Sequence, residues 1–272
     1  MTTAQEWTGP VGDVWAQEWR RTDRSFSGLT AKLVPAILAQ APDSGQAIDI
    51  GCGAGETAIA LASAKPDLAV TGIDISAELL AIAQTRAGAL PNLEFEAADA
   101  ASSAAAHAPV DLYLSRHGVM FFDDPLAAFT RLRAAASDKA RLIFSCFRDW
   151  HDNGFAHVIA ALAGEGPPPP DAPGPFAFAD KDKVTRLLDQ SGWTGIEARP
   201  VDFSYIAGQG ADPVADALSF LRRIGPAARA IRTAPEDQRA ALIAALTDIC
   251  EKHRTGDAVL FPAAAWIWTT RA

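Results

Sequence analysis

The chain has 272 residues, of which 49% are hydrophobic and 21% charged, and its formal net charge is −9. This length allows one well-buried core with an appended subdomain. The acidic balance, without any basic run, excludes nucleic acid as an expected partner. No apolar stretch approaches the roughly 20 residues that a membrane span needs. The N-terminus has no signal-peptide pattern, and Cys52, Cys146 and Cys250 suggest neither a zinc site nor disulfides. We therefore expect a cytoplasmic protein with no metal and no membrane partner.

Short apolar runs alternate with helical patterns in the first half of the chain, which is typical of βαβ units around a mainly parallel sheet. Strands are predicted at residues 47–50, 69–73, 93–97, 110–114 and 141–147. Helices are predicted at 7–38, at 56–64, from residue 77 after the capping residue Ser76, and behind Pro125.

The second half of the chain is less regular. The proline-rich segment 164–175 predicts a stiff surface loop, because proline removes hydrogen-bond donors and fixes φ. A helix at 183–190, a strand at 196–203, helices at 213–232 and 235–254, and a last strand at 258–270 follow. We expect a helical cap at 1–40, an α/β core at 41–202 with an insertion at 148–179, a helical lid at 203–256 and a terminal core strand at 257–272.

A glycine-rich loop, Asp49-Ile50-Gly51-Cys52-Gly53-Ala54-Gly55, follows the first predicted strand and opens a helix. Glycines permit a tight turn and let a ligand approach the backbone closely. The N-terminus of the following helix directs N–H groups and partial positive charge toward that ligand. The loop therefore predicts a nucleotide-type binding site.

Acidic residues stand at the ends of the first three predicted strands: Asp49, Asp74 and Asp99. A carboxylate at Asp74 can accept the two hydroxyls of a ribose, and one at Asp99 can accept from an adenine amino group. The glycine spacing is GxGxG, whereas dinucleotide enzymes have GxGxxG. Asp49 would repel a pyrophosphate but suits a ligand with an ammonium and a sulfonium group. S-adenosylmethionine carries both groups and is the predicted cofactor.

At these residues the chain resembles the class I S-adenosylmethionine-dependent methyltransferases, over residues 45–148. More loosely, it looks like the bacterial small-molecule branch that includes the quinone-biosynthesis-type enzymes. That likeness is carried by residues 7–15, the run 115–122 (SRHGVMFF), and the segments 173–176, 224–226 and 261–266.

The resemblance implies a role for each residue of the cofactor site. Those expected to flank the methionine part are Asp49, Gly51, Cys52, Gly53 and Gly55. Asp74 would hold the ribose and Ile75 would pack on adenine. Asp99 and the backbone of Ala100 would bind the adenine edge, and the carbonyl of Ser115 would meet the methionine amino group.

The fold implied by the resemblance is a Rossmann-like, seven-stranded, mostly parallel α/β sheet with helices on both faces. It ends in an antiparallel strand pair, placed at 196–203 and 258–270. The insertions and the N-terminal helix are expected to form a helical lid over the substrate.

Methyl transfer from a sulfonium is a displacement that mainly needs the acceptor held in line in a desolvated site. His117, just after the fourth strand, is the candidate base, with packing as the alternative. Arg116 could pair with a substrate carboxylate, but a pair with Asp123 or Asp124 is favoured. Residues that could line an aromatic substrate pocket are Trp15, His117, Phe121, Phe122 and Trp150; aromatic side chains are more often core.

The sequence thus predicts methyl transfer to a small, apolar or aromatic acceptor at oxygen or carbon. A non-catalytic S-adenosylmethionine-binding or regulatory protein is the first alternative. An NAD(P)-dependent oxidoreductase is the second, and it is disfavoured by the loop spacing and by Asp49. The helices at 213–254 could form a homodimer interface, although an apolar helical stripe usually packs within its own chain.

Overall fold

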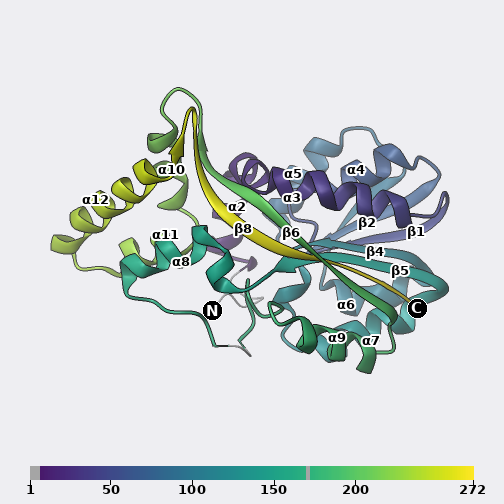
Figure 1. Ribbon diagram of the computed structural model, residues 1–272. Helices are drawn as coiled ribbons and strands as arrows, with labels where there is room; N and C mark the ends of the chain where they lie inside the picture. The colour runs from purple at the N-terminus through teal and green to yellow at the C-terminus, as the bar shows by residue number, and fades with distance from the viewer. Residues whose placement is uncertain (1–6, 170–171) are drawn as a thin grey trace.

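The computed structural model describes residues 7–169 and 172–272. Residues 1–6 of the predicted cap and 170–171 of the predicted insertion lie outside this part. The strands form one sheet in the order β3-β2-β1-β4-β5-β8-β6, with the short β7 beside β8. β1 to β5 are parallel to one another, and β8 is antiparallel to β5 and β6 (Figure 1). This order confirms the predicted mostly parallel α/β fold.

The strands are β1 (Gly45–Ile50), β2 (Leu68–Asp74), β3 (Leu93–Ala97), β4 (Val110–Arg116), β5 (Ala136–Phe147), β6 (Thr194–Gln209), β7 (Arg254–Thr255) and β8 (Ala258–Arg271). The α-helices are α2 (Pro10–Gln17), α3 (Trp19–Gln40), α4 (Glu56–Ala64), α5 (Ala77–Ala87), α6 (Ala100–Ser103), α7 (Pro125–Ala135), α8 (Gly154–Ala160), α9 (Lys181–Gln190), α10 (Pro213–Leu221), α11 (Pro226–Thr233) and α12 (Glu236–Lys252).

Alternation along the strands divides the core into two layers, because successive side chains point to opposite faces of a sheet. Ala47 of β1 and Leu112 of β4 pack with helices α3 and α4 on one face. Ile48 and Tyr113, the next residues along, belong to the cluster on the other face, with α7 and α9. Figure 1 shows these two helical layers on either side of the sheet.

Several helices begin where a short polar side chain caps their free N–H groups. The hydroxyl of Ser76 accepts from the amide of Leu79, as predicted, and the carboxylate of Asp124 accepts from the amide of Ala127. The first cap sets the start of α5 just beyond the carboxyl end of β2, and the second sets the start of α7 after the 3₁₀ turn that follows β4.

The N-terminal helix expected at 7–38 is two helices, α2 and α3, which meet at Glu18. α3 buries Leu29, Leu33 and Ile37 against the sheet. Its N-terminal half packs along β6, where the hydroxyl of Ser25 donates to the carbonyl of Ile206 at 2.9 Å, and Phe26 is buried among aromatic rings.

The single helix expected at 213–232 is also two helices, α10 and α11. Gly225, with φ of +84°, turns the chain, and Pro226 begins α11 because it has no N–H to continue the preceding helix. The expected boundary between residues 202 and 203 falls inside β6, which continues to Gln209. α8, α10, α11 and α12 gather at the end of the long β6–β8 pair (Figure 1). Across residues 7–169 and 172–272, no helix has the length and hydropathy to cross a membrane.

Replacing Leu33 by alanine should lower the free energy of unfolding by about 2–5 kcal/mol, because it removes a fully buried side chain between α3 and the sheet. Leu126→Ala is the matched control, since Leu126 is 42% exposed, and it should change stability by less than about 0.5 kcal/mol. Urea denaturation of both variants measures this. Equal losses would show that α3 does not depend on this packing.

Candidate active site

The carboxyl ends of β1 and β4 come unusually close together. A Cβ placed on Gly118 would lie 2.4 Å from the carbonyl oxygen of Ile50, and one on Gly51 would lie 3.0 Å from the Cα of Gly118. Only glycine fits at both positions. β1 lies between β2 and β4, where the strand order reverses, and ligands of open α/β sheets bind at this point.

The glycine-rich loop turns sharply between β1 and α4. Gly51, Gly53 and Gly55 have φ of +63°, +55° and +81°, values that other residues rarely adopt. The amide of Cys52 donates to the carbonyl of Ile73 at 3.1 Å, which ties the loop to β2. A Cβ on Gly53 would meet no atom within 4 Å, so the loop leaves open space at this point.

Asp74 ends β2 and braces the same loop. Its carboxylate accepts from the amide of Gly53 at 2.8 Å and from the amide of Ser76 at 2.9 Å. Burial raises the pKa of Asp74, and these backbone donors act in the opposite direction. Each carboxylate oxygen keeps a second lone pair, so Asp74 can still accept a ligand hydroxyl.

Asp49 is fully buried beneath the loop. The hydroxyl of Thr57 donates to its Oδ2 at 2.6 Å, while Oδ1 is buried without a hydrogen-bond partner. Burial raises the pKa of Asp49 to about 7, against the opposing effects of Thr57 and the positive charge of Arg116. An unpartnered buried carboxylate oxygen is costly, and a cationic ligand group nearby would stabilise it.

The other expected cofactor residues divide into two groups. Those that line the cavity with Asp74 are Gly51, Cys52, Gly53, Ile75, Asp99 and Ala100. Asp49, Gly55 and Ser115 are not among the cavity-lining residues. Ser115 lies behind the wall: its hydroxyl donates to the carbonyl of Ile50 at 2.7 Å and accepts from the amide of Gly118 at 3.1 Å. Asp99 also caps α6 by accepting from the amide of Ser102.

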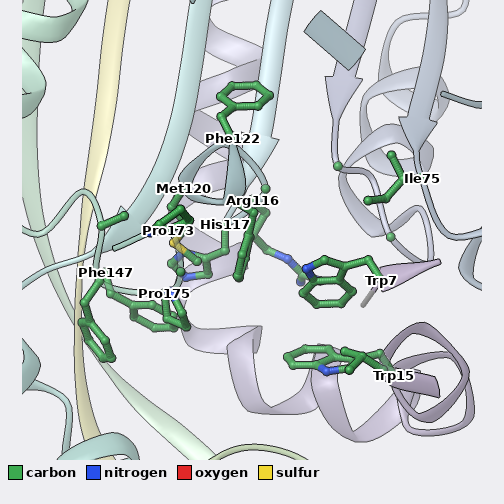
Figure 2. Close-up of a pocket in the computed structure, with 18 of the residues that line it drawn as sticks. Trp7, Trp15, Ile75, Arg116, His117, Met120, Phe122, Phe147, Pro173 and Pro175 are labelled. Atoms are coloured by element: carbon green, nitrogen blue, oxygen red, sulfur yellow. The ribbon is translucent and has the colours of Figure 1, made fainter. Parts of the chain in front are cut away.

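A single cavity of about 1200 Å³ extends from this loop to an aromatic end. Figure 2 shows Ile75 near Trp7 and Trp15 at one end, and His117, Met120 and Phe147 at the other. The prolines Pro173 and Pro175 close the aromatic end, and the amide of Gly174 between them donates to the carbonyl of Met120. This volume exceeds the roughly 300–1,000 Å³ of most small-molecule sites and is enough for a cofactor and a second molecule.

His117 has the only positive φ among the described non-glycine residues, at +61°. Its ring stacks on Phe147 with centroids 4.1 Å apart, and neither ring nitrogen has a hydrogen-bond partner. Burial, together with the charge of Arg116, lowers the pKa of His117 to about 3. The imidazole is therefore neutral at physiological pH, and a strained, unpartnered polar group in a cavity is typical of a functional site.

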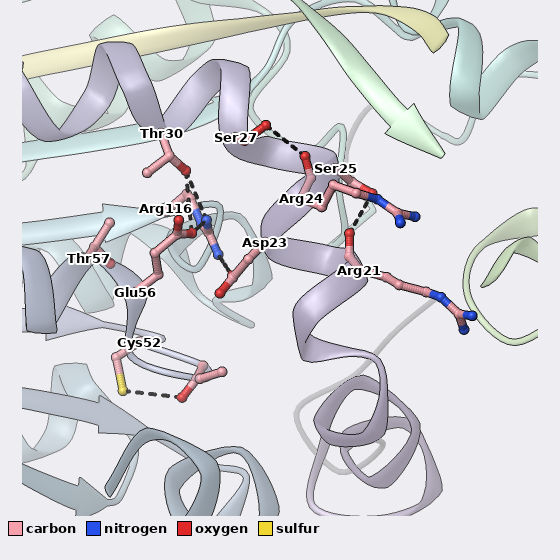
Figure 3. A network of polar contacts seen from close by, with 12 residues as sticks. Arg21, Asp23, Arg24, Ser25, Ser27, Thr30, Cys52, Glu56, Thr57 and Arg116 are labelled. Atoms are coloured by element: carbon pink, nitrogen blue, oxygen red, sulfur yellow. Dashed lines mark hydrogen bonds and ion pairs between the residues drawn. The ribbon is translucent and has the colours of Figure 1, made fainter. Parts of the chain in front are cut away.

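Arg116 does not pair with Asp123 or Asp124, so that expectation is wrong. Its guanidinium contacts Asp23 of α3 at 2.9 Å and also pairs with Glu56, the first residue of α4 (Figure 3). Asp123 and Asp124 follow a 3₁₀ turn after β4, whereas the Arg116 side chain extends toward α3. Both partners come from other elements that the fold brings to the end of β4.

The expected substrate-pocket residues all line the cavity: Trp15, His117, Phe121, Phe122 and Trp150. Four further residues line it that the sequence did not predict: Asp23, Phe26, Phe147 and Phe176. Phe147 ends β5. Its position at the carboxyl end of a parallel strand could have indicated that it lines the site. Cys52 is buried and its pKa is raised well above the ordinary value, in agreement with a space-filling thiol.

A family model described as a methyltransferase domain matches residues 47–138 of the chain. This region is a methyltransferase domain. It begins in β1 and includes the glycine loop, Asp74, Asp99 and the turn at His117. The cofactor of such class I domains is S-adenosylmethionine, as the loop and its acids predicted.

Known proteins agree with this assignment. A trans-aconitate 2-methyltransferase of Rhizobium meliloti is 41% identical over 68 residues, which are 24% of this chain and 25% of that enzyme. The alignment thus spans about a quarter of that enzyme's length.

Solved structures show the same fold. A methyltransferase from an antibiotic biosynthesis pathway of Anabaena variabilis superposes with a TM-score of 0.58 at 19% identity, covering 88% of this chain and 97% of that one. A Haemonchus contortus phosphoethanolamine N-methyltransferase in complex with S-adenosyl-L-methionine gives a TM-score of 0.55 at 12% identity, covering 100% of this chain and 60% of that one. The fold is that of the class I methyltransferases.

Ionisation of Asp49 should make the protein less stable as the pH rises. Its folded pKa of about 7 exceeds the ordinary value of 3.8, so its contribution is complete below pH 4 and is lost as pH rises through 7. Between pH 5 and pH 7 this corresponds to about 2 kcal/mol. Urea unfolding at both pH values should show that the free energy of unfolding decreases less between pH 5 and pH 7 for Asp49→Asn than for the wild type. An equal decrease for the two proteins would mean that Asp49 is ionised at both pH values.

Proposed function

We propose that the protein transfers a methyl group from S-adenosylmethionine to a small, apolar or aromatic acceptor. One observation carries this proposal: a single cavity joins the glycine loop and Asp74 to an aromatic end that contains an unpartnered neutral histidine. Displacement at a methyl group requires the acceptor to be held in line with that group in a desolvated site, and one cavity that reaches both ends supports such an arrangement.

The residues at the loop end fit the cofactor. Gly53 leaves open space, Asp74 can accept ribose hydroxyls, and the unpartnered Oδ1 of Asp49 supplies negative charge near the methionine end. Ile75 and Trp7 offer apolar surface to an adenine ring. When bound, S-adenosylmethionine supplies an electrophilic methyl group on a sulfonium.

The aromatic end favours an uncharged acceptor. Phe26 and Phe147 surround His117, and Met120 is buried beside them. The neighbouring cation, Arg116, is neutralised by Asp23 and Glu56 and is therefore not free for an acceptor carboxylate. A flat apolar molecule would bury much of its surface here.

We propose that His117 orients the acceptor by accepting a hydrogen bond from its hydroxyl or enol. With a pKa of about 3, the ring holds a proton poorly, so it suits this role better than that of a general base. The backbone of His117 is in the left-handed region, and its ring stacks on Phe147. An in-line approach of the acceptor oxygen then depends on this contact.

A tricarboxylate such as trans-aconitate is the second candidate acceptor, as the name of the Rhizobium meliloti relative suggests. Arg223, Arg229 and Arg232 line the cavity near α11 and could bind carboxylates. Two of them are already paired, Arg223 with Glu18 and Arg229 with Glu165. We therefore place the apolar acceptor first.

Calorimetric titration with S-adenosylhomocysteine, and with NADH for comparison, tests the cofactor. We expect micromolar binding of S-adenosylhomocysteine and none of NADH. Asp74→Ala should weaken binding by about 10- to 150-fold, because ribose hydroxyls lose a charged acceptor worth about 1.5–3 kcal/mol. Asp67→Ala, at an exposed position between α4 and β2, is the control. Binding of NADH alone would overturn the proposal, and unchanged affinity in Asp74→Ala would place the ribose elsewhere.

Turnover with labelled S-adenosylmethionine and a panel of phenols, quinone precursors and trans-aconitate tests the acceptor. On the best phenolic acceptor, His117→Ala should lower kcat/KM by about 2- to 13-fold, the worth of one hydrogen bond. The wild-type profile should show no loss of activity near pH 6.5, since His117 stays neutral. Methylation of trans-aconitate alone would favour the second candidate. Tight cofactor binding without any turnover would favour a regulatory protein.

A further inference from the structure

Asp23 of α3 lies between two arginines that come from distant parts of the chain. Its Oδ1 is 2.9 Å from Nη2 of Arg116, at the end of β4, and its Oδ2 is 2.8 Å from Nη2 of Arg86, on α5. The Asp23 side chain is only 14% exposed, so solvent screens these contacts weakly. One carboxylate thus holds two like charges together.

Arg86 extends this contact to the cofactor loop. Its Nη1 donates to the carbonyl of Ala54 at 2.7 Å, and Ala54 lies between Gly53 and Gly55, which both have positive φ. The guanidinium also lies over the ring of Trp19, 4.1 Å from its centroid. Since Trp19 begins α3, the loop carbonyl is fixed through Arg86 to two residues of this helix.

Arg116 extends the contact to the acceptor end. Its Nη1 donates to the hydroxyl of Thr30, also on α3, at 3.0 Å, and pairs with Glu56, as Figure 3 shows. The residue that follows is His117, whose strained backbone sets the direction of its ring. Two carboxylates, Asp23 and Glu56, balance the two guanidiniums, so the group carries no net charge while all four are ionised.

We propose that Asp23 is a positioning residue that couples the N-terminal helix α3 to the cofactor loop and to the turn at His117. Without its negative charge, Arg86 and Arg116 repel each other in a partly buried space, and Arg86 no longer holds the carbonyl of Ala54 in place. The loop then loses the shape that receives the cofactor. This inference rests on the proposed function, because it concerns affinity for the same cofactor.

Titration with S-adenosylhomocysteine tests the coupling. We expect Asp23→Asn, which keeps the size of the side chain and removes its charge, to weaken binding about 5- to 50-fold. Arg86→Gln should weaken binding similarly. The double variant should bind no more weakly than the single variant of lower affinity, because both changes break the same contact between Asp23 and Arg86. Asp23→Glu should restore part of the affinity. Asp43→Asn is the matched control, since it breaks the exposed pair with Lys65 and should bind normally.

A purely structural role for Asp23 predicts a different result. The melting temperature of the ligand-free Asp23→Asn variant would fall while its affinity stayed within twofold of the wild type, or the losses of the single variants would multiply in the double variant. Either outcome overturns the coupling. If Asp23→Asn does not fold, Arg86→Gln with unchanged affinity overturns it as well. Wild-type protein that binds no S-adenosylhomocysteine overturns the proposed function, whereas normal binding by wild type and Asp23→Asn together overturns only this inference.

Discussion

The close approach of β1 and β4 at their carboxyl ends is the constraint on which the site depends. Gly51 and Gly118 allow the two chains to come together, and any side chain at Gly118 would collide with the carbonyl of Ile50. This approach places the glycine loop beside the turn at His117. The glycine-loop end and the aromatic end therefore share one cavity.

The two ends of the site differ in charge: one is acidic, and the other is apolar with its cation neutralised. Acids gather at the loop end, where Asp49 is buried and Asp74 faces the cavity. At the other end the cation of Arg116 is neutralised, and aromatic rings lower the basicity of His117 by excluding water. The same burial that raises the pKa of a carboxyl at one end lowers that of an imidazole at the other.

Local patterns in the sequence predicted the elements that local chemistry controls. Helix α4 begins and ends where expected, and Ser76 caps α5 as its position indicated. The division at Glu18 could not be predicted, because neither glycine nor proline marks it. The partners of Arg116 could not be predicted either, since Asp23 and Glu56 lie far away along the chain and meet it only in the folded protein.

Helix α3 makes the methyltransferase domain dependent on a segment outside it. The domain covers residues 47–138, yet Leu29, Leu33 and Ile37 of α3 cover one face of its sheet, and Phe26 reaches the cavity. A fragment cut at the domain boundary would expose that apolar face to water and would lack one wall of its own pocket. Transplanting the pocket intact would therefore require this helix as well, because the family match covers only part of what encloses it.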